Sequence, residues 1–138
     1  MTLELSQKQL AAKLLLEKSD KNMEQAIKTA ELGYWDLVAN RLYYAVFHAV
    51  NAMLLADGIK TGTHKGTSMQ FGKSYVLTGA FKREDGILYG KLQTMREKAD
   101  YQNVFTLEEG VGRELIESAD ELRKRICARV DQKICGES

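Results

Sequence analysis

Residues 40–58 read NRLYYAVFHAVNAMLLADG, and this stretch decides the fold. Its apolar residues recur at helical spacing and surround almost the whole circumference of the helix that they predict. A helix that is apolar nearly all round lies at the centre of a protein. The pattern therefore predicts a central helix that starts at 34–36 and ends at 57–58.

The predicted central helix carries one polar stripe. Arg41 and His48 share a face because residues seven apart differ by only about 20° in helical phase. Tyr44 and Asn51 fall on the same stripe. Burying an unpartnered arginine costs several kcal/mol, so this stripe must face a partner side chain, a polar cleft, water or a second chain. The adjacent stripe consists of small residues suited to close helix packing, namely Ala45, Ala49, Ala52 and Ala56.

The remainder of the chain predicts further helices separated by turns. Ser6 and Gln9 form a capping box at the first start, and Thr106 and Glu109 form another before the last helix. The loop DGIKTGTHKG at 57–66 has the glycine content of a turn region. The predicted helices cover residues 6–33, 34–58, 65–78, 83–100 and 106–133. We expect one domain over residues 1–138, an all-α, antiparallel up-and-down helical bundle of four long helices plus a short helix.

The composition narrows the class of protein. The chain has 138 residues, 44% of them hydrophobic and 28% charged, and it has no proline. The net charge of +1 argues against a strongly basic nucleic-acid coat but leaves room for a local basic groove. Two cysteines, Cys127 and Cys135, are too few for a disulfide scaffold or a zinc site. No signal peptide or membrane span is recognisable, so we expect a cytoplasmic protein with no membrane partner, metal or cofactor.

Two interpretations of the polar stripe follow from the residues alone. In the structural one, Arg41 pairs with a carboxylate such as Asp36 or Asp100, and His48 donates a hydrogen bond inside the core. In the functional one, the pair faces a cleft and acts on an anion. Arginine binds phosphate through its planar fork, and histidine exchanges a proton near neutral pH. An arginine and a histidine without a metal-ligand set suit metal-free phosphodiester cleavage, but spacing alone leaves both interpretations open.

Two other places carry candidate side chains. His64 lies at a predicted helix start, where free N–H groups and Lys65 can hold an anion; the alternative is a turn histidine that helps to cap the helix. Arg96 and Asp100 have the spacing of a helical ion pair. We expect that pair to order the end of the fourth predicted helix beside the cleft.

Three segments together resemble a known family. They are RLYYAVFHAVNAMLLADGI at 41–59, THKGTSMQFGKSYVLTG at 63–79 and MREKADYQ at 95–102. In this order and at these separations they are similar to the HEPN domains of small bacterial proteins. The resemblance extends over about residues 14–129, and its central mark is an arginine followed after six residues by a histidine.

The resemblance implies a helical bundle that commonly forms a homodimer, in which two Arg–His motifs line one cleft. Many members are metal-independent RNA endonucleases, often toxins that act beside a nucleotidyltransferase-like antitoxin partner. When the family motif is carried over to this sequence, His48 is the acid/base that helps the RNA 2′-OH to attack the adjacent phosphate, and Arg41 binds that phosphate. The products are a 2′,3′-cyclic phosphate and a 5′-hydroxyl. Helical phase adds Tyr44 and Asn51 as further polar groups of the cleft.

One departure from the family pattern keeps a second hypothesis open. Active members often carry a polar residue directly after the arginine, but Leu42 stands here. Asn40 precedes the arginine, and we expect it to lie on the wrong side to replace that polar group. The second hypothesis is a non-catalytic module that binds a nucleotide or a protein partner in the same cleft.

Overall fold

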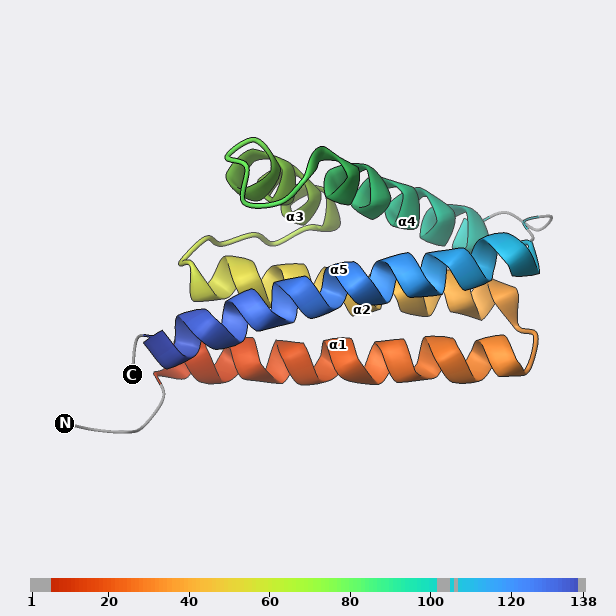
Figure 1. Ribbon diagram of the computed structural model, residues 1–138, viewed down its shortest axis with the longest axis horizontal. Helices are drawn as coiled ribbons and strands as arrows, with labels where there is room; N and C mark the ends of the chain where they lie inside the picture. Colours follow the sequence, from red (N-terminus) through yellow and green to blue (C-terminus); the bar gives the residue numbers. More distant parts are fainter. Residues whose placement is uncertain (1–5, 102–104, 106, 137–138) are drawn as a thin grey trace.

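A computed structural model describes residues 6–101, 105 and 107–136, and these residues form helices and loops with no strand. In Figure 1, α1 and α4 run in one direction and α2 and α5 run in the opposite one. The all-α helical bundle predicted from the sequence is confirmed. The helices are α1 (Gln7–Glu31), α2 (Trp35–Ala56), α3 (His64–Phe71), the π-helical segment η1 (Gly72–Val76), α4 (Arg83–Tyr101) and α5 (Glu109–Gly136).

Helix α1 begins at the capping box that the sequence predicts. The Ser6 Oγ accepts from the Gln9 backbone N–H at 3.1 Å, and Gln9 Oε1 accepts from the Ser6 N–H at 2.9 Å. These two bonds satisfy backbone donors that a helix start leaves without intrahelical partners. The second predicted box involves Thr106, which lies outside the described residues.

The short helix predicted at 65–78 consists of two pieces. Thr63 caps α3, because its Oγ1 accepts from the Gly66 N–H at 2.8 Å, and His64 is the first helical residue. At Gly72 the helix widens into the π-helical segment η1. The chain then turns at Gly79, whose φ of 84° lies in the region that favours glycine.

Helix α2 forms the centre of the bundle and packs on α1, α4 and α5. Its alanine stripe is buried throughout, and the Ser19 Oγ of α1 donates to the Ala45 carbonyl at 2.6 Å. Small side chains on α2 permit this close approach of the two helices. The prediction that 34–58 forms the central helix is therefore confirmed.

Helix α4 is joined to α5 by an ion pair. Arg125 donates to both carboxylate oxygens of Asp85, at 2.9 and 2.7 Å, and Asp85 is 5% exposed. Asp85 also accepts from the Lys82 backbone N–H at 3.0 Å, at the start of α4. The hydrogen bond from Arg125 is the main reason that the pKa of Asp85 lies below its ordinary value.

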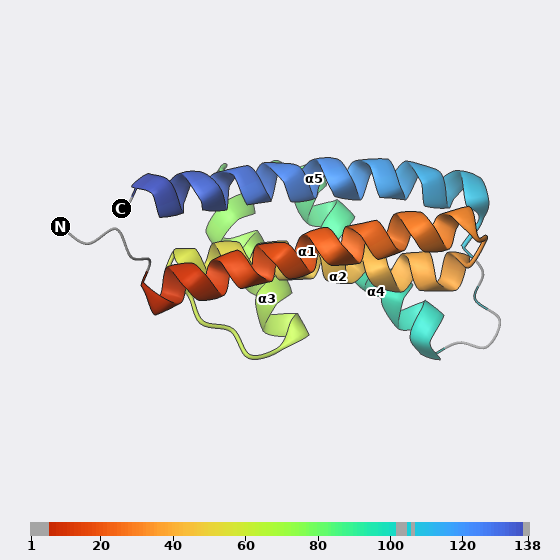
Figure 2. The same cartoon turned by 90° about the horizontal axis from the view of Figure 1, so that it is seen from below.

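The beginning of α3 and the end of α4 lie on the same side of the α1–α2 pair (Figure 2). His64 of α3 packs against Phe47 of α2, and Asp100 near the end of α4 accepts a hydrogen bond from Asn40. Both elements therefore border the polar stripe of α2. Within the described residues, no helix is both long enough and apolar enough to cross a membrane.

Candidate functional site

Arg41 is held by side-chain amides. Its Nε donates to Asn40 Oδ1 at 2.9 Å, and its Nη2 donates to the same oxygen. Its Nη1 donates to Asn22 Oδ1 at 3.0 Å and to Gln25 Oε1 at 3.2 Å, both on α1. A guanidinium has five N–H donors, so these bonds leave one donor of Nη2 for another acceptor.

The charge of Arg41 is not cancelled by a direct ion pair within the described residues. The structural interpretation predicts that Arg41 pairs with a carboxylate such as Asp36 or Asp100, and among the described residues no such pair forms. Asp100 is linked to Arg41 through Asn40, whose Nδ2 donates to Asp100 Oδ1 at 3.2 Å. Asn40, expected on the wrong side to replace a polar residue at position 42, nevertheless contacts the Arg41 guanidinium. A partly buried arginine among neutral amides keeps its affinity for an anion.

His48 shares the polar face with Arg41, as its spacing predicts. Tyr44 lies between them: the Arg41 Cζ is 5.7 Å from the Tyr44 ring centroid, and the Tyr44 and His48 centroids are 5.9 Å apart. Among the described residues, none forms a hydrogen bond with the His48 imidazole. The hydrogen bond that the structural interpretation places inside the core is therefore absent from this part of the chain, and the half-buried ring lines a cavity.

The pKa of His48 is lowered from its ordinary value of 6.5. Burial is the largest cause, followed by the positive charges of Lys18 and Arg41. Both effects disfavour the imidazolium form. His48 is therefore mostly neutral at pH 7, and a neutral imidazole is the form that accepts a proton.

A cavity of about 500 Å³ opens beside His48, between α2 and the loop that leads into α3. The stacked rings of Phe47 and His64, with centroids 4.5 Å apart, form an aromatic wall. The surface that lines the cavity is mostly apolar and includes several hydroxyl groups. The lining residues are Leu15, Phe47, His48, Asn51, Leu55, Ile59, Lys60, Thr61, Gly62, Thr63, His64 and Thr67.

Of the two candidate residues at the start of α3, His64 and Lys65, only the first lines the cavity. His64 lines the cavity, and its Nδ1 forms a 2.7 Å hydrogen bond with the Tyr43 hydroxyl. Burial, followed by the charge of Arg96, lowers the pKa of His64. Lys65 is exposed and is not among the residues that line the cavity. Thr63, not His64, caps the helix.

Asn51 lines the cavity but also joins α2 to the loop before α3. Its Oδ1 accepts from Thr61 Oγ1 at 3.2 Å and from Thr67 Oγ1 at 3.0 Å. Its Nδ2 donates to the Phe47 carbonyl at 3.1 Å. This amide therefore has a structural role that its helical phase does not reveal.

Arg96 of α4 packs over two aromatic side chains of α2. Its Cζ lies 5.0 Å from the Tyr43 ring centroid and 5.9 Å from that of Tyr44. Its Nη1 lies 3.5 Å from Asp100 Oδ2, which confirms the ion pair predicted from their spacing. Sequence reasoning missed the stacking, as well as the α1 residues that hold Arg41.

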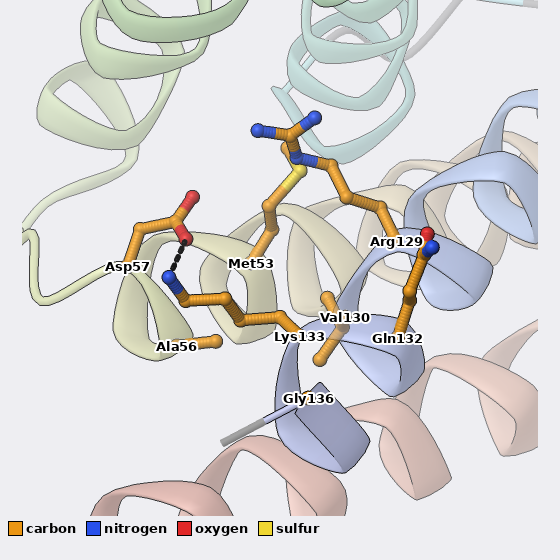
Figure 3. A pocket seen from close by; sticks show the side chains of 8 residues that line it. All are labelled: Met53, Ala56, Asp57, Arg129, Val130, Gln132, Lys133 and Gly136. Atoms are coloured by element: carbon orange, nitrogen blue, oxygen red, sulfur yellow. Dashed lines mark ion pairs between the residues drawn. The ribbon is translucent and has the colours of Figure 1, made fainter.

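A second cavity, of about 400 Å³, lies between the C-terminal ends of α2 and α5. Figure 3 shows the Asp57–Lys133 ion pair, with 4.0 Å between Oδ1 and Nζ, spanning it. The Tyr75 hydroxyl donates to the other oxygen of Asp57 at 2.5 Å. Neither Arg41 nor His48 lines this cavity. His48 lines the first cavity, whereas Arg41 and Tyr44 are not among its lining residues and lie farther along the same face of α2. The candidate site is therefore this polar face of α2 together with the cavity beside His48.

The fold and the site define an α-helical bundle whose central helix presents an arginine and a histidine on one face, with the histidine beside a cavity. The sequence model of the HEPN domain matches residues 12–130. The chain belongs to the HEPN domain family, as the sequence motifs indicated.

Several curated relatives are similar over part of the chain. A UPF0332 protein of Thermotoga maritima is 35% identical over 81 residues, which cover 59% of this chain and 61% of the relative. Two proteins of Methanocaldococcus jannaschii bear the names "Putative toxin MJ0142" and "Putative toxin MJ0605". The first is 29% identical, covering 63% of this chain and 59% of the relative. The second is 35% identical, covering 63% and 65%. The chain thus spans about three fifths of the length of these relatives.

Proposed function

We propose that this protein is a metal-independent endoribonuclease of toxin–antitoxin type. One observation carries the proposal: Arg41, held by neutral amides and by no carboxylate among the described residues, shares a face with His48, whose imidazole lines a cavity. The names of the Methanocaldococcus relatives support a toxin-like role. Such an enzyme would act on RNA in the cytoplasm.

In the proposed reaction, RNA supplies its own nucleophile. Neutral His48 accepts the proton of the 2′-OH while the 2′ oxygen attacks the adjacent phosphorus. The P–O5′ bond breaks, and the 5′ oxygen takes a proton from an imidazolium, which leaves a 2′,3′-cyclic phosphate and a 5′-hydroxyl. Arg41 donates to the phosphate oxygens and stabilises the charge that builds up in the transition state.

Arg41 has the donors that this role needs. One N–H of Nη2 is available, and a phosphate oxygen can displace the amide of Asn22 or Gln25 from Nη1. That exchange is favourable because a phosphate oxygen carries negative charge, which an amide oxygen does not, and because arginine and phosphate can form two parallel N–H···O bonds. Tyr44 and the cavity residues Asn51 and His64 are proposed to contact the bound RNA, and Lys65 to attract it from the adjacent surface.

A homodimer would bring two Arg41–His48 pairs to one cleft and supply one imidazole as base and a second as acid. Exposed leucines support such an interface: Leu37, one turn before Arg41 on α2, is 51% exposed, and Leu14 on α1 is 53% exposed. We expect Leu37→Glu to convert a dimer into a monomer in size-exclusion chromatography with light scattering, and to reduce cleavage in parallel.

The decisive experiment is RNA cleavage with and without EDTA. Wild-type protein should cut in both conditions and leave cyclic-phosphate and 5′-hydroxyl ends. Arg41→Ala and His48→Ala should each lose at least about 100-fold in rate, as expected when a proton-transfer group or a transition-state donor is removed. Lys65→Ala is the matched control, because Lys65 is an exposed cation outside the cavity, and its loss should weaken RNA binding slightly with little effect on the rate. Cleavage that stops in EDTA, or that persists in both alanine variants, contradicts the proposal.

The alternative function is a non-catalytic module that binds a nucleotide or a protein partner. Leu42 favours it, because this side chain is 0% exposed and no polar group follows Arg41. A protein that binds nucleotides in calorimetry through Arg41 but cuts no RNA would support this alternative. A nucleotidyltransferase-like antitoxin is the proposed partner in either case, and its co-expression should relieve any growth arrest that the protein causes.

A further inference from the structure

We propose that Asn40 and Asp100 form a bridge that positions Arg41 and thereby replaces the polar residue that is absent at position 42. The bridge extends from the Asp100 carboxylate of α4 through the Asn40 amide to the Arg41 guanidinium. It makes Asn40 and Asp100 positioning residues, and for catalysis it rests on the function proposed above.

The chemistry of the three groups permits only one orientation of the Asn40 amide. A guanidinium donates hydrogen bonds but cannot accept them, whereas a carboxylate only accepts them. Asn40 must therefore turn its Oδ1 to Arg41 and its Nδ2 to Asp100, and this is the arrangement observed: 2.9 Å from the Arg41 Nε, and 3.2 and 3.5 Å to the two Asp100 oxygens. A carboxylate that fixes the amide in this way also polarises its oxygen toward Arg41.

Asp100 is itself anchored. Arg96 lies 3.5 Å from Asp100 Oδ2 and has a side chain that is only 11% exposed. The Arg96 guanidinium stacks over the Tyr43 ring, which is 0% exposed. The bridge therefore starts from a packed part of α4 and ends at the half-buried side chain of Arg41.

Leu42 explains why Arg41 needs such support. The side chain of Leu42 lies wholly in the core, so the residue after the arginine contributes nothing to the polar face. Arginine has a long side chain with many rotamers, and the bonds from Nη1 to α1 are those that a phosphate can displace. The bond from Nε to Asn40 can persist when a phosphate binds to the Nη groups. The bridge thus keeps the guanidinium in place in the free and in the bound state.

The first test measures the Arg41 side chain directly. ¹⁵N relaxation of the Arg41 Nε should report a lower order parameter in Asn40→Ala and in Asp100→Asn than in wild type. Glu97→Gln is the matched control: Glu97 lies 3.9 Å from the same Arg96 and loses the same charge, but no hydrogen bond joins it to Asn40 among the described residues. The relaxation of the Arg41 Nε in Glu97→Gln should match that in the wild type. Unchanged Arg41 relaxation in both Asn40→Ala and Asp100→Asn overturns the bridge, whether or not the protein cuts RNA.

The second test is a double-mutant cycle on RNA cleavage. Asn40→Ala should lower kcat/KM by about 10-fold to 100-fold through misplacement of Arg41, and Asp100→Asn by about 3-fold to 10-fold, because a neutral oxygen still accepts a hydrogen bond. The double variant should be no slower than Asn40→Ala, since Asp100 acts only through Asn40. Independent losses that multiply would overturn the bridge. Failure of the proposed function appears differently, as wild-type protein that cuts no RNA, and the relaxation test then decides on the bridge alone.

Discussion

Replacement of Asn51 by alanine should destabilise the protein, because this amide joins α2 to the loop before α3. Its oxygen accepts from Thr61 and Thr67, and its nitrogen donates to the Phe47 carbonyl. At a net value of about 1 kcal/mol for each hydrogen bond, the three bonds amount to about 3 kcal/mol.

The measured loss should be smaller than this sum. Thr67 retains an acceptor in the Thr63 carbonyl at 3.1 Å, and Thr61 retains one in the Thr67 hydroxyl at 3.0 Å. These alternatives keep the donors satisfied and recover about 1 kcal/mol, and the better helix propensity of alanine recovers about 0.5 kcal/mol. We therefore expect Asn51→Ala to lower the free energy of unfolding by about 1.5 kcal/mol.

Urea denaturation followed by circular dichroism measures this loss of stability. A double-mutant cycle of Asn51→Ala with Thr67→Val tests whether the loss arises from the contact between the two side chains. The double variant should show a coupling energy of at least about 0.5 kcal/mol between the two positions, as expected for groups in direct contact. Thr78→Val is the control, because Thr78 is exposed and its change should stay within about 0.5 kcal/mol. If Asn51→Ala is as stable as wild type, the amide does not join α2 to the loop and α3, and a cycle without coupling shows that its bond with Thr67 of α3 contributes nothing.

Two further predictions concern pH and packing. The acid limb of kcat/KM should have its midpoint below pH 6.5, because the pKa of His48 is lowered and its neutral form accepts the proton. Lys18→Gln removes a cation and should move that midpoint upward, and a downward shift in the pH–rate profile contradicts this assignment. Gly112→Ala should be less stable than Gly90→Ala by about 1–3 kcal/mol in urea denaturation. A Cβ at position 112 would lie 2.7 Å from the Trp35 ring, whereas one at position 90 meets no atom within 4 Å. Equal stability of the two glycine variants is the result that contradicts this packing argument.

The sequence predicted the helices well because their signals are local. The central helix predicted over 34–58 is α2 (Trp35–Ala56), and the Ser6–Gln9 capping box is present. The predicted 65–78 helix shows the limit of this reasoning. Its change to π-helical geometry at Gly72 has no signal in residue periodicity, and this segment contacts α4, a separate element of the predicted pattern.

The candidate site was predictable only in part. A seven-residue spacing is enough to place Arg41 and His48 on one face, but the partners of Arg41 depend on tertiary structure. Asn22 and Gln25 reach Arg41 because of the register between α1 and α2, which no local pattern states. The contact between Asn40 and Arg41 has no signal in helical phase, which treats side chains as radial, whereas the flexible stem of arginine lets the guanidinium turn back to the preceding residue.

The three amides that hold Arg41 have a consequence for how the site responds to its surroundings. Carboxamides neither gain nor lose a proton in the range in which proteins remain folded. On the proposed function, the amide contacts of the arginine are therefore constant with acidity, whereas the imidazoles of the site exchange protons near neutral pH. Affinity and proton transfer then become separable in kinetics, with a flat pH profile for KM and a sloping one for kcat.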